Sequence, residues 1–420
     1  MSYAVFYGRA VLGDLFSTRA RLRFTYRAEV VQDGGPALSV RLPARDAAYA
    51  HDDASPYFSN LLPEDEYRRL LARMLGLSDR NVAGLLGAIG GECAGAVSIW
   101  PAGQQPAAVP DYVLLADEDV RRLFESPDAS ERMDIVREGR LSLAGGMEKL
   151  GLRRREERWY RGRGGAPTTH ILKWSPARFP DLTCNELLCL KLFEAAGFAM
   201  PAAQIEGPGT PVLIVERFDR RVAADEKVAV IHQEDFCQAL GVEPAQKYQT
   251  EGGPGFAACA KIIRDHCAVP ARDLGQLLRW AVANYLVGNG DAHGKNLSLL
   301  HDADGVRLAP IYDVGSTLVY GGLSRKLAMS VGGEYWFEFL RARHWERLAE
   351  DLGLPFDRVR RDALSLASRF EASLLDVHRR LVAVHGDQAI FGRVAEVVTL
   401  QIARLREQLS GSRGERHTDA

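Results

Sequence analysis

The chain has 420 residues, 46% of them hydrophobic and 26% charged, a composition typical of soluble globular proteins with roughly two or three domains. Its 53 lysines and arginines against 55 aspartates and glutamates give a formal net charge of −2, which argues against a polycationic nucleic-acid-binding protein. The six cysteines are scattered and include no C-x-x-C pair, which argues against disulfides and zinc sites. The N-terminus has no signal-peptide pattern, and no apolar run reaches the ~18 residues of a membrane helix. We therefore expect a cytoplasmic protein.

The first hundred residues predict an N-terminal subdomain, residues 1–105, that combines a small antiparallel sheet with short helices. Alternating apolar and polar residues indicate the strands, with turn signals at 13–14 and 33–36 between them. The predicted strands are 3–7, 22–26, 37–42 and 95–100. A helical period predicts two helices, at 63–77 and 79–88, and the Pro/Ala-rich stretch 101–110 indicates a linker.

The next segment, residues 106–220, predicts a small mixed lobe, and residues 221–409 predict a larger helical lobe. The smaller lobe's predicted strands are 112–115, 150–152, 170–174 and 213–218, and its predicted helices are 117–124 and 185–196. A basic, glycine-rich turn is predicted at 161–165. We expect the larger lobe to be mainly helical, interrupted by a central glycine-containing motif and by a loop at 320–333. The polar tail, 410–420, is expected to be disordered.

The central motif, Val287-Gly-Asn-Gly-Asp-Ala-His-Gly-Lys-Asn-Leu-Ser-Leu299, carries the functional interpretation. It holds Asp291 with Asn296 five positions later, the spacing by which protein kinases place a proton-accepting carboxylate next to a magnesium-binding amide. An apolar run follows, and Asp313 then supplies a second carboxylate, as the second metal-binding Asp of a kinase does. The pattern therefore indicates Asp291 as the catalytic base, and Asn296 and Asp313 as magnesium ligands.

Residues upstream follow the order of a kinase nucleotide site. Lys173 ends a predicted apolar strand between a glycine-containing segment, 142–149, and a predicted helix that contains Glu186. Alone, Lys173 would be interpreted as a snorkelling lysine and the glycines as a plain turn, because the segment matches neither G-x-G-x-x-G nor the Walker A pattern. In line with the catalytic motif, we interpret Gly145 and Gly146 as backbone that approaches phosphate, and Lys173 as a neutraliser of phosphate charge.

Other segments are open to two interpretations. Residues 216–218 lie where a kinase has its adenine-binding hinge, but an ordinary salt-bridged edge strand fits equally well. The segment 247–255, with three glycines and a proline, is either a surface loop or an element that faces a substrate or partner. His293 and His301 lack a local partner at a zinc spacing, so we favour structural histidines over metal ligands. We interpret the arginines at 153–155, 161 and 163 as solvated loop charges, with recognition of an acidic or phosphorylated partner as the alternative.

Taken together, these motifs resemble the HipA family, bacterial serine/threonine kinases that act as toxins of type II toxin–antitoxin systems. The resemblance runs from about Tyr3 to Leu409 and depends on several motifs in the same order. They are PYFSNLLP at 56–63, GGECAGA at 90–96, SLAGGMEK at 142–149, HILK at 170–173, VERFDR at 215–220, QED at 233–235, KY and GGPG within 247–255, GDAHGKN at 290–296 and YD at 312–313. The family implies an α+β, protein-kinase-like fold with a mostly helical C-terminal lobe, a small mixed N-lobe and an added N-terminal antiparallel β-sheet subdomain.

The resemblance also implies the roles of individual residues. The ATP-binding residues would be Ala144, Gly145, Gly146, Met147, Glu148, Lys149, Lys173, Glu216, Arg217, Phe218, His293, Lys295 and Tyr312. Asp291 would again be the base, and Asn296 and Asp313 the Mg²⁺ ligands. In the family, autophosphorylation of a serine in the glycine-containing loop moves the loop out and silences the kinase, and Ser142 occupies that place. One departure from the family pattern is the Gly-Gly-Met tripeptide at 145–147.

Partners and a cellular role are implied as well. Family members bind a small helix-turn-helix antitoxin, HipB, that represses the shared operon, so operator DNA would be contacted through the antitoxin. Known targets include aminoacyl-tRNA synthetases, whose inhibition stalls translation and favours dormancy. We therefore expect an ATP- and Mg²⁺-dependent protein kinase that arrests growth. Two other functions stay open: a corepressor that only binds antitoxin and operator DNA, against which the retained kinase residues argue, and a small-molecule phosphotransferase acting on sugars or aminoglycosides.

Overall fold

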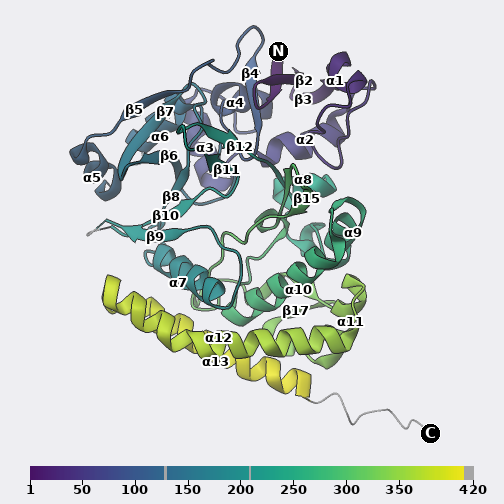
Figure 1. The fold of residues 1–420 in the computed structure, drawn as a ribbon, viewed down its shortest axis with the longest axis vertical. Coiled ribbons are helices and arrows are strands. Elements are labelled where there is room, and N and C mark those ends of the chain that lie inside the picture. Colours follow the sequence, from purple (N-terminus) through teal and green to yellow (C-terminus); the bar gives the residue numbers. More distant parts are fainter. Residues whose placement is uncertain (127–129, 208–209, 411–420) are drawn as a thin grey trace. The chain divides into compact units, whose positions relative to one another are not determined.

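The computed structural model describes residues 1–126, 130–207 and 210–410 (Figure 1). They form two compact units that are interleaved along the chain. The first unit comprises Met1–Thr183, Pro201–Gln246 and Ser298–Ala309, and the second comprises Cys184–Met200, Lys247–Leu297 and the chain from Pro310 onward. The predicted N-terminal subdomain therefore lies within the first unit, and the domain boundaries predicted at 105 and 220 stay predictions. No helix within the described ranges is long and apolar enough to cross a bilayer.

A four-stranded antiparallel sheet with the order β3-β2-β1-β4 forms the N-terminal part of the first unit. Its strands are β1 (Ser2–Tyr7), β2 (Ala10–Thr18), β3 (Arg21–Tyr26) and β4 (Val97–Pro101). The small antiparallel sheet and the strands predicted at 3–7, 22–26 and 95–100 are confirmed. Val5 and Phe24 are fully buried within alternating burial patterns, as the period of two in a half-buried sheet requires.

Two predictions in this region are wrong. The turn expected at 13–14 is part of β2, where a glycine is needed for close approach: a Cβ on Gly13 would lie 2.4 Å from a carbonyl oxygen of β3. The strand expected at 37–42 is irregular chain, because a buried side chain takes its backbone donor: the Val40 N–H donates to Glu234 Oε1 at 2.9 Å. In both places tertiary contacts override the local signal.

Four helices accompany this sheet: α1 (Ala28–Gln32), α2 (His51–Asn60), α3 (Asp65–Met74) and α4 (Val82–Ile89). α3 and α4 confirm the helices predicted at 63–77 and 79–88, and the Asn81 side chain caps the start of α4. The sequence does not predict α2, because its last seven residues are all buried and leave no amphipathic period to read.

A six-stranded antiparallel sheet with the order β5-β7-β6-β8-β10-β9 forms the second part of the first unit. Its strands are β5 (Asp111–Leu114), β6 (Lys149–Arg155), β7 (Arg158–Arg163), β8 (His170–Trp174), β9 (Ala203–Glu206) and β10 (Val212–Glu216). The helices α5 (Asp117–Glu125) and α6 (Ser130–Gly139) precede β6. The strands predicted at 112–115, 150–152 and 170–174 and the helix predicted at 117–124 are confirmed. The strand predicted at 213–218 is present but ends at Glu216, and it lies inside the sheet, so the interpretation as an edge strand is wrong.

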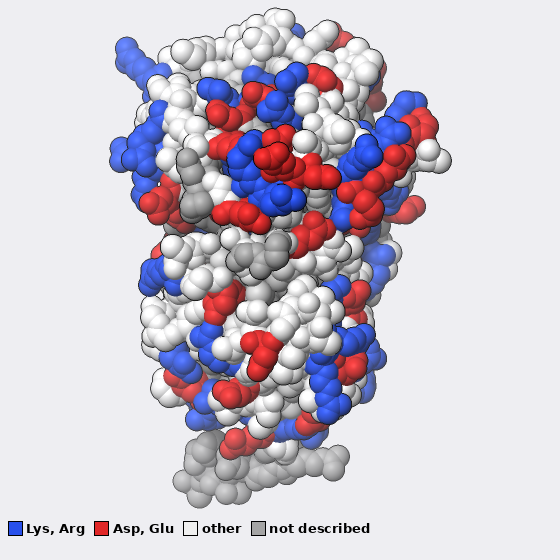
Figure 2. Space-filling view, turned by 90° about the vertical axis from the view of Figure 1, so that its left-hand side faces the viewer, with Lys and Arg blue, Asp and Glu red and all other residues white. Residues whose placement is uncertain are grey.

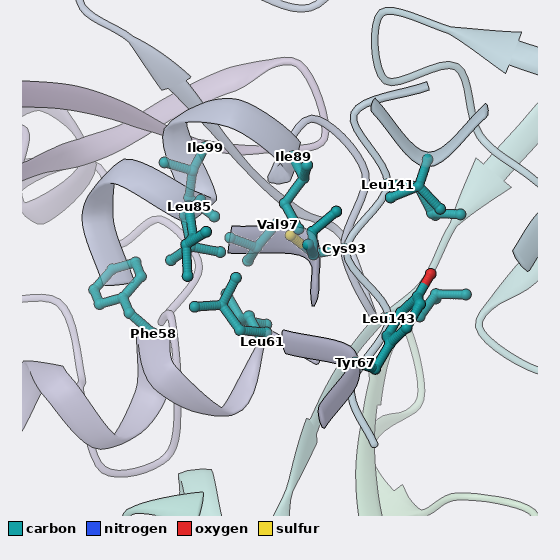
Figure 3. Packing of buried hydrophobic residues seen from close by; sticks show 14 of the residues in the cluster. Phe58, Leu61, Tyr67, Leu85, Ile89, Cys93, Val97, Ile99, Leu141 and Leu143 are labelled. Carbon is teal, nitrogen blue, oxygen red and sulfur yellow. The ribbon is translucent and has the colours of Figure 1, made fainter. Parts of the chain in front are cut away.

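The core of the first unit is a cluster of buried apolar side chains from both of its parts. Figure 3 shows Phe58 of α2 and Ile89 of α4 in this cluster, together with Leu141 and Leu143 from the chain that follows α6. Because Leu141 and Leu143 are both buried, the glycine-containing segment 142–149 begins in the same core as the N-terminal sheet. All six cysteines of the chain are also buried, and none of them forms a disulfide.

The arginines expected in solvated loops lie on strands instead. β7 extends to Arg163, so the predicted turn at 161–165 is shorter than expected. Arg153 is only 8% exposed, and its guanidinium lies 3.0 Å from the Glu226 carboxylate. Arg161 likewise pairs with an acidic side chain, Glu138, at 3.1 Å. Positive and negative side chains are interspersed over the face drawn in Figure 2, as expected for a net charge of −2.

The remaining elements of the first unit are short: β11 (Arg220–Val222), β12 (Val228–Val230), β13 (His232–Asp235), α8 (Phe236–Leu240), η1 (Pro244–Gln246), β14 (Ser298–Asp302) and β15 (Gly305–Leu308). β11 pairs with β12, and β13, β14 and β15 form a three-stranded sheet. The sequence does not predict these strands, because such short runs carry too little periodicity. His301 of β14 has the structural role expected of it, since Nε2 lies 2.9 Å from Glu234 Oε1.

The second unit is mainly helical, as predicted. Its elements are α7 (Leu182–Ala195), η2 (Gln249–Glu251), α9 (Phe256–His266), α10 (Pro270–Val287), η3 (Gly294–Asn296), β16 (Lys326–Val331), β17 (Glu334–Trp336), η4 (Phe337–Phe339), α11 (Ala342–Leu352), α12 (Phe356–His385) and α13 (Ala389–Ser410). α7 confirms the helix predicted at 185–196. The loop predicted at 320–333 is wrong in its second half, which forms β16. Of the predicted disordered tail, 410–420, Ser410 is the last residue of α13, and the rest lies outside the described residues.

A buried ionic cluster joins the two parts of the first unit. Glu92 precedes β4, Arg217, Asp219 and Arg220 follow β10, and all four side chains are at most 7% exposed. Arg217 lies 3.1 Å from Glu92 and 2.9 Å from Asp219, and Arg220 lies 3.2 Å and 2.9 Å from the same two residues. Burial alone would raise the pKa of Asp219, but Arg217 and Arg220 outweigh burial and hold that pKa well below its usual value. Two positive and two negative charges thus compensate one another away from water.

Asp219→Asn should lower the free energy of unfolding by about 3–5 kcal/mol, because it leaves buried arginine charge uncompensated. Asp225→Asn is the matched control, since this side chain is 54% exposed, and it should change the stability by less than about 0.5 kcal/mol. Urea unfolding of the wild type and both variants measures the difference. Equal stability of the two variants would contradict the assignment of a charge-compensated cluster.

Candidate active site

The central motif forms a tight turn that its own side chains and backbone hold together. The Asp291 N–H donates to Asn289 Oδ1 at 2.9 Å. The His293 N–H donates to the Asp291 carbonyl at 2.9 Å, and the Asn296 N–H donates to the His293 carbonyl at 2.9 Å, which closes η3. The Asp291 side chain is 51% exposed, so this turn presents a carboxylate to solvent on a fixed backbone.

Hydrogen bonds also join the predicted metal ligands to this turn. Asn296 Nδ2 donates to the Asp291 carbonyl at 3.0 Å, which leaves the amide oxygen of Asn296 as the atom that could bind a cation. The Tyr312 hydroxyl donates to the Lys295 carbonyl at 2.7 Å, and so ties the residue before Asp313 to the residue before Asn296. Asp313 has a φ of +56°, a left-handed conformation that is uncommon for aspartate and that tends to occur at functional sites.

The start of α7 is bound to the same region of the second unit. Asn185 Nδ2 donates to the Ser316 carbonyl at 2.9 Å, and the Ser316 N–H donates back to Asn185 Oδ1 at 2.8 Å. Asn185 directly precedes Glu186, and Ser316 follows Asp313 by three positions. Glu186, which is only 4% exposed, therefore lies on a helix that is fixed to the chain carrying Asp313.

The glycine-containing segment of the first unit is held by the N-terminal subdomain. Ser142 is fully buried, its Oγ donates to the Leu61 carbonyl at 2.7 Å, and its N–H donates to the Glu92 carbonyl at 2.8 Å. Farther along, the Gly145 carbonyl accepts the Glu64 N–H at 3.1 Å. Gly145 has a φ of +114°, which favours glycine at this point of the segment.

Lys149 and Lys173 lie opposite each other on β6 and β8. Opposed residues on neighbouring strands project from the same face of a sheet, and like charges in that arrangement repel each other. Lys149 Nζ donates to the Ala144 carbonyl at 3.2 Å, and a Cβ on Gly145 would lie 2.5 Å from that nitrogen, so the ammonium group lies against the glycine backbone. Two opposed positive charges next to a glycine backbone are suited to binding a polyphosphate.

Two predicted nucleotide-binding residues direct their side chains elsewhere. The Glu148 carboxylate pairs with the guanidinium of Arg132, a residue that is 4% exposed. The Arg217 guanidinium belongs to the buried ionic cluster. Glu148 and Arg217 are thus left to contact a nucleotide through their backbone groups. The hinge role of Glu216, Arg217 and Phe218 stays a prediction.

The predicted site residues therefore fall into two groups. The first unit carries Ser142, Ala144, Gly145, Gly146, Met147, Glu148, Lys149, Lys173, Glu216, Arg217 and Phe218. The second unit carries Asp291, His293, Lys295, Asn296, Tyr312 and Asp313. Within each unit, hydrogen bonds and strand register bring key members of the group together, and a shared nucleotide site stays a prediction.

Sequence reasoning missed Tyr248, whose hydroxyl donates to Asp291 Oδ1. The only sequence signal for it was the glycine-rich composition of its segment, 247–255, which indicated an element that faces a substrate or partner. It also missed the two backbone groups, at Leu61 and Glu64, that hold the glycine-containing segment. No side-chain pattern marks such contacts, because a backbone group is offered by any residue type.

Two family models match the chain. The model of the HipA N-terminal domain matches residues 3–100, and the model of the HipA-like C-terminal domain matches residues 141–375. The chain belongs to the HipA family. Every predicted site residue lies within the second match, and the segments that hold Ser142 and Gly145 lie within the first.

Relatives and a solved structure agree with this assignment. “Putative kinase Y4mE” of Sinorhizobium fredii is 37% identical over 367 residues, which cover 86% of this chain and 87% of that protein. “Serine/threonine-protein kinase toxin HipA” of Shewanella oneidensis is 30% identical over 96% of this chain and 94% of that protein. HipA in the Shewanella oneidensis complex of HipA, HipB and operator DNA matches with a TM-score of 0.82 and 26% identity over 97% of each chain. The predicted family and the α+β, kinase-like fold are confirmed, and the names of the relatives support kinase activity in general.

Ser142→Asp should release the glycine-containing segment, because an unpaired carboxylate cannot remain buried against the Leu61 carbonyl. Hydrogen exchange followed by mass spectrometry should show that amides 142–149 lose protection. Ser142→Ala is the control: it removes one buried hydrogen bond, costs about 1 kcal/mol and should keep the protection. Full protection of the segment in the aspartate variant would show that position 142 tolerates charge, contrary to its burial.

Proposed function

We propose that this chain is a protein serine/threonine kinase that uses ATP and Mg²⁺. The observation that supports this most directly is the arrangement of Asp291, Asn296 and Asp313 around one turn of the second unit. Hydrogen bonds from Asn296 Nδ2 to the Asp291 carbonyl and from Tyr312 to the Lys295 carbonyl hold that arrangement. Membership of the HipA family and the kinase names of the relatives support the same function.

In this proposal the chain's own residues position the reactants and balance their charge. Asp291 accepts the proton of the substrate hydroxyl. Lys149 and Lys173 neutralise phosphate charge, and the N–H groups of Gly145 and Gly146 approach phosphate oxygens. Bound MgATP would supply the γ-phosphoryl group. Orientation of the reactants and neutralisation of phosphate charge would account for most of the rate enhancement.

The proposed metal ligands suit magnesium. The amide oxygen of Asn296 and the carboxylate of Asp313 are hard oxygen donors of the kind that Mg²⁺ prefers. Within the part of the chain that the structure describes, no group of three or more His, Cys, Asp and Glu side chains could hold a metal ion by itself. Mg²⁺ commonly binds through one or two protein ligands together with water and substrate phosphates, so this donor set fits a metal that binds with the nucleotide.

Asp291→Asn should lower phosphate transfer by at least about 100-fold, because the amide cannot accept the hydroxyl proton. Affinity for MgATP, measured by calorimetry, and thermal stability should stay at the wild-type level. Incorporation of ³²P from γ-labelled ATP into the chain and into added cell protein measures the transfer, with Asp304→Asn, an exposed turn residue, as the matched control. Transfer at the wild-type rate by the Asp291 variant would refute the assignment of the base.

We extend the proposal to control of this activity by Ser142. Phosphorylation would add about −1.5 to −2 charge at a position that is 0% exposed, so the modified segment could not keep its present contacts. Autophosphorylation at Ser142 would therefore switch the kinase off. For the target, we propose a cytoplasmic protein whose modification slows translation, with aminoacyl-tRNA synthetases as the first to examine.

We also propose a HipB-like antitoxin as partner. The solved Shewanella oneidensis structure contains HipA with HipB and operator DNA, and this chain matches that HipA over 97% of its length. The net charge of −2 gives this chain little attraction of its own to DNA, so contact with the operator would depend on the antitoxin.

A short helix-turn-helix protein encoded next to this chain should co-purify with it and relieve the growth arrest that the chain causes. The Asp291→Asn variant should bind the same protein with unchanged affinity and should not arrest growth, because we assign Asp291 to catalysis alone. Co-expression, pull-down and growth curves provide the measurement. Growth arrest by the Asp291 variant would favour toxicity through binding alone.

A further inference from the structure

The Asp291 carboxylate has one hydrogen-bond donor among the described residues, the hydroxyl of Tyr248. The Tyr248 O–H donates to Asp291 Oδ1 at 2.5 Å. His293 Nε2 lies 3.9 Å from that same oxygen, beyond hydrogen-bonding distance. Both groups approach Oδ1, so Oδ2 is the oxygen that remains for a substrate proton.

Tyr248 is itself fixed by the segment 247–255. Its ring meets the His293 ring edge-on, with the centroids 5.4 Å apart and the planes at 86°. The next residue, Gln249, accepts hydrogen bonds through Oε1 from the N–H of Ser330 at 2.7 Å and from the Ser330 hydroxyl at 3.1 Å. The segment is thus anchored to β16 on one side of Tyr248, and the ring packs on the catalytic turn on the other. A hydroxyl held in this way can orient the group that it binds.

We propose that Tyr248 is a positioning residue for phosphate transfer: its hydroxyl fixes the Asp291 carboxylate through Oδ1 and so aims Oδ2 at the substrate hydroxyl. This inference rests on the proposed kinase function. The Asp291 side chain is 51% exposed and otherwise free to change its side-chain rotamer, whereas a base must stay within hydrogen-bond reach of the proton it accepts. Misplacement of a reacting group by about 1 Å can lower a rate about 100-fold, so one oriented hydrogen bond can determine the rate of transfer.

Two substitutions separate positioning by the hydroxyl from packing by the ring. Tyr248→Phe removes only the hydroxyl and keeps the ring on His293, whereas Tyr248→Ala removes both. Tyr335→Phe is the matched control, since this tyrosine lies in the same unit on β17 and its hydroxyl has no hydrogen bond among the described residues. Each full-length protein is mixed with Mg²⁺, γ-³²P-labelled ATP and added cell protein, and the rate of label incorporation into the chain and into the added protein is measured. Calorimetry with MgATP and thermal melting accompany the rates.

We expect both Tyr248 variants to transfer phosphate about tenfold or more slowly than the wild type, with unchanged MgATP affinity and unchanged melting, and Tyr335→Phe to match the wild type. A normal rate for Tyr248→Phe with a slow Tyr248→Ala would overturn the inference, since ring packing alone would then matter. A faster Tyr248→Phe would overturn it too, because the tyrosine would then block the base. If the wild type transfers no phosphate, or Asp291→Asn transfers it normally, the proposed function itself fails.

Discussion

The side-chain amide of Asn296 makes one contact through its nitrogen and is proposed to make another through its oxygen. The candidate active site depends on both contacts. The amide nitrogen donates to the Asp291 carbonyl, so the amide oxygen is left to act as a metal ligand. This one hydrogen bond sets the spacing between the proposed base and the proposed metal, because both side chains project from the same short turn. The bond from Tyr312 to the Lys295 carbonyl extends the arrangement to Asp313. The backbone at Asp313 is left-handed, a conformation that costs energy for aspartate. The hydrogen bond made by the neighbouring Tyr312 helps to hold it in place.

The first unit meets a different requirement, which is to hold positive charge next to a glycine backbone. Lys149 and Lys173 are opposed on neighbouring strands, and the segment before Lys149 is fixed by backbone groups at Leu61 and Glu64. These two residues belong to the N-terminal subdomain, which the buried ionic cluster joins to the six-stranded sheet region. The N-terminal subdomain therefore holds the glycine-containing segment that we assign to the proposed nucleotide site.

Sequence reasoning succeeded for elements that carry predicted site residues. The strand that contains Lys173 and the helix that contains Glu186 are both present as expected. It failed where tertiary contacts decide: the backbone at 37–42 gives up a strand because Glu234 binds it, and α2 is buried almost all round. The contact of Tyr248 with Asp291 could not be predicted either, since the two residues are 43 positions apart and no local pattern connects them.

Catalysis as proposed depends most on Asn296 and Asp313, which would hold one magnesium ion near the Asp291 carboxylate within the second unit. The most direct measurement is a crystal structure of the full chain with Mg²⁺ and a non-hydrolysable ATP analogue. We predict that Asn296 Oδ1 and the Asp313 carboxylate will bind the metal at about 2.0–2.1 Å, with the Asp291 carboxylate next to the γ-phosphate. A nucleotide bound away from these residues, or a metal without Asn296 and Asp313 among its ligands, would contradict the account.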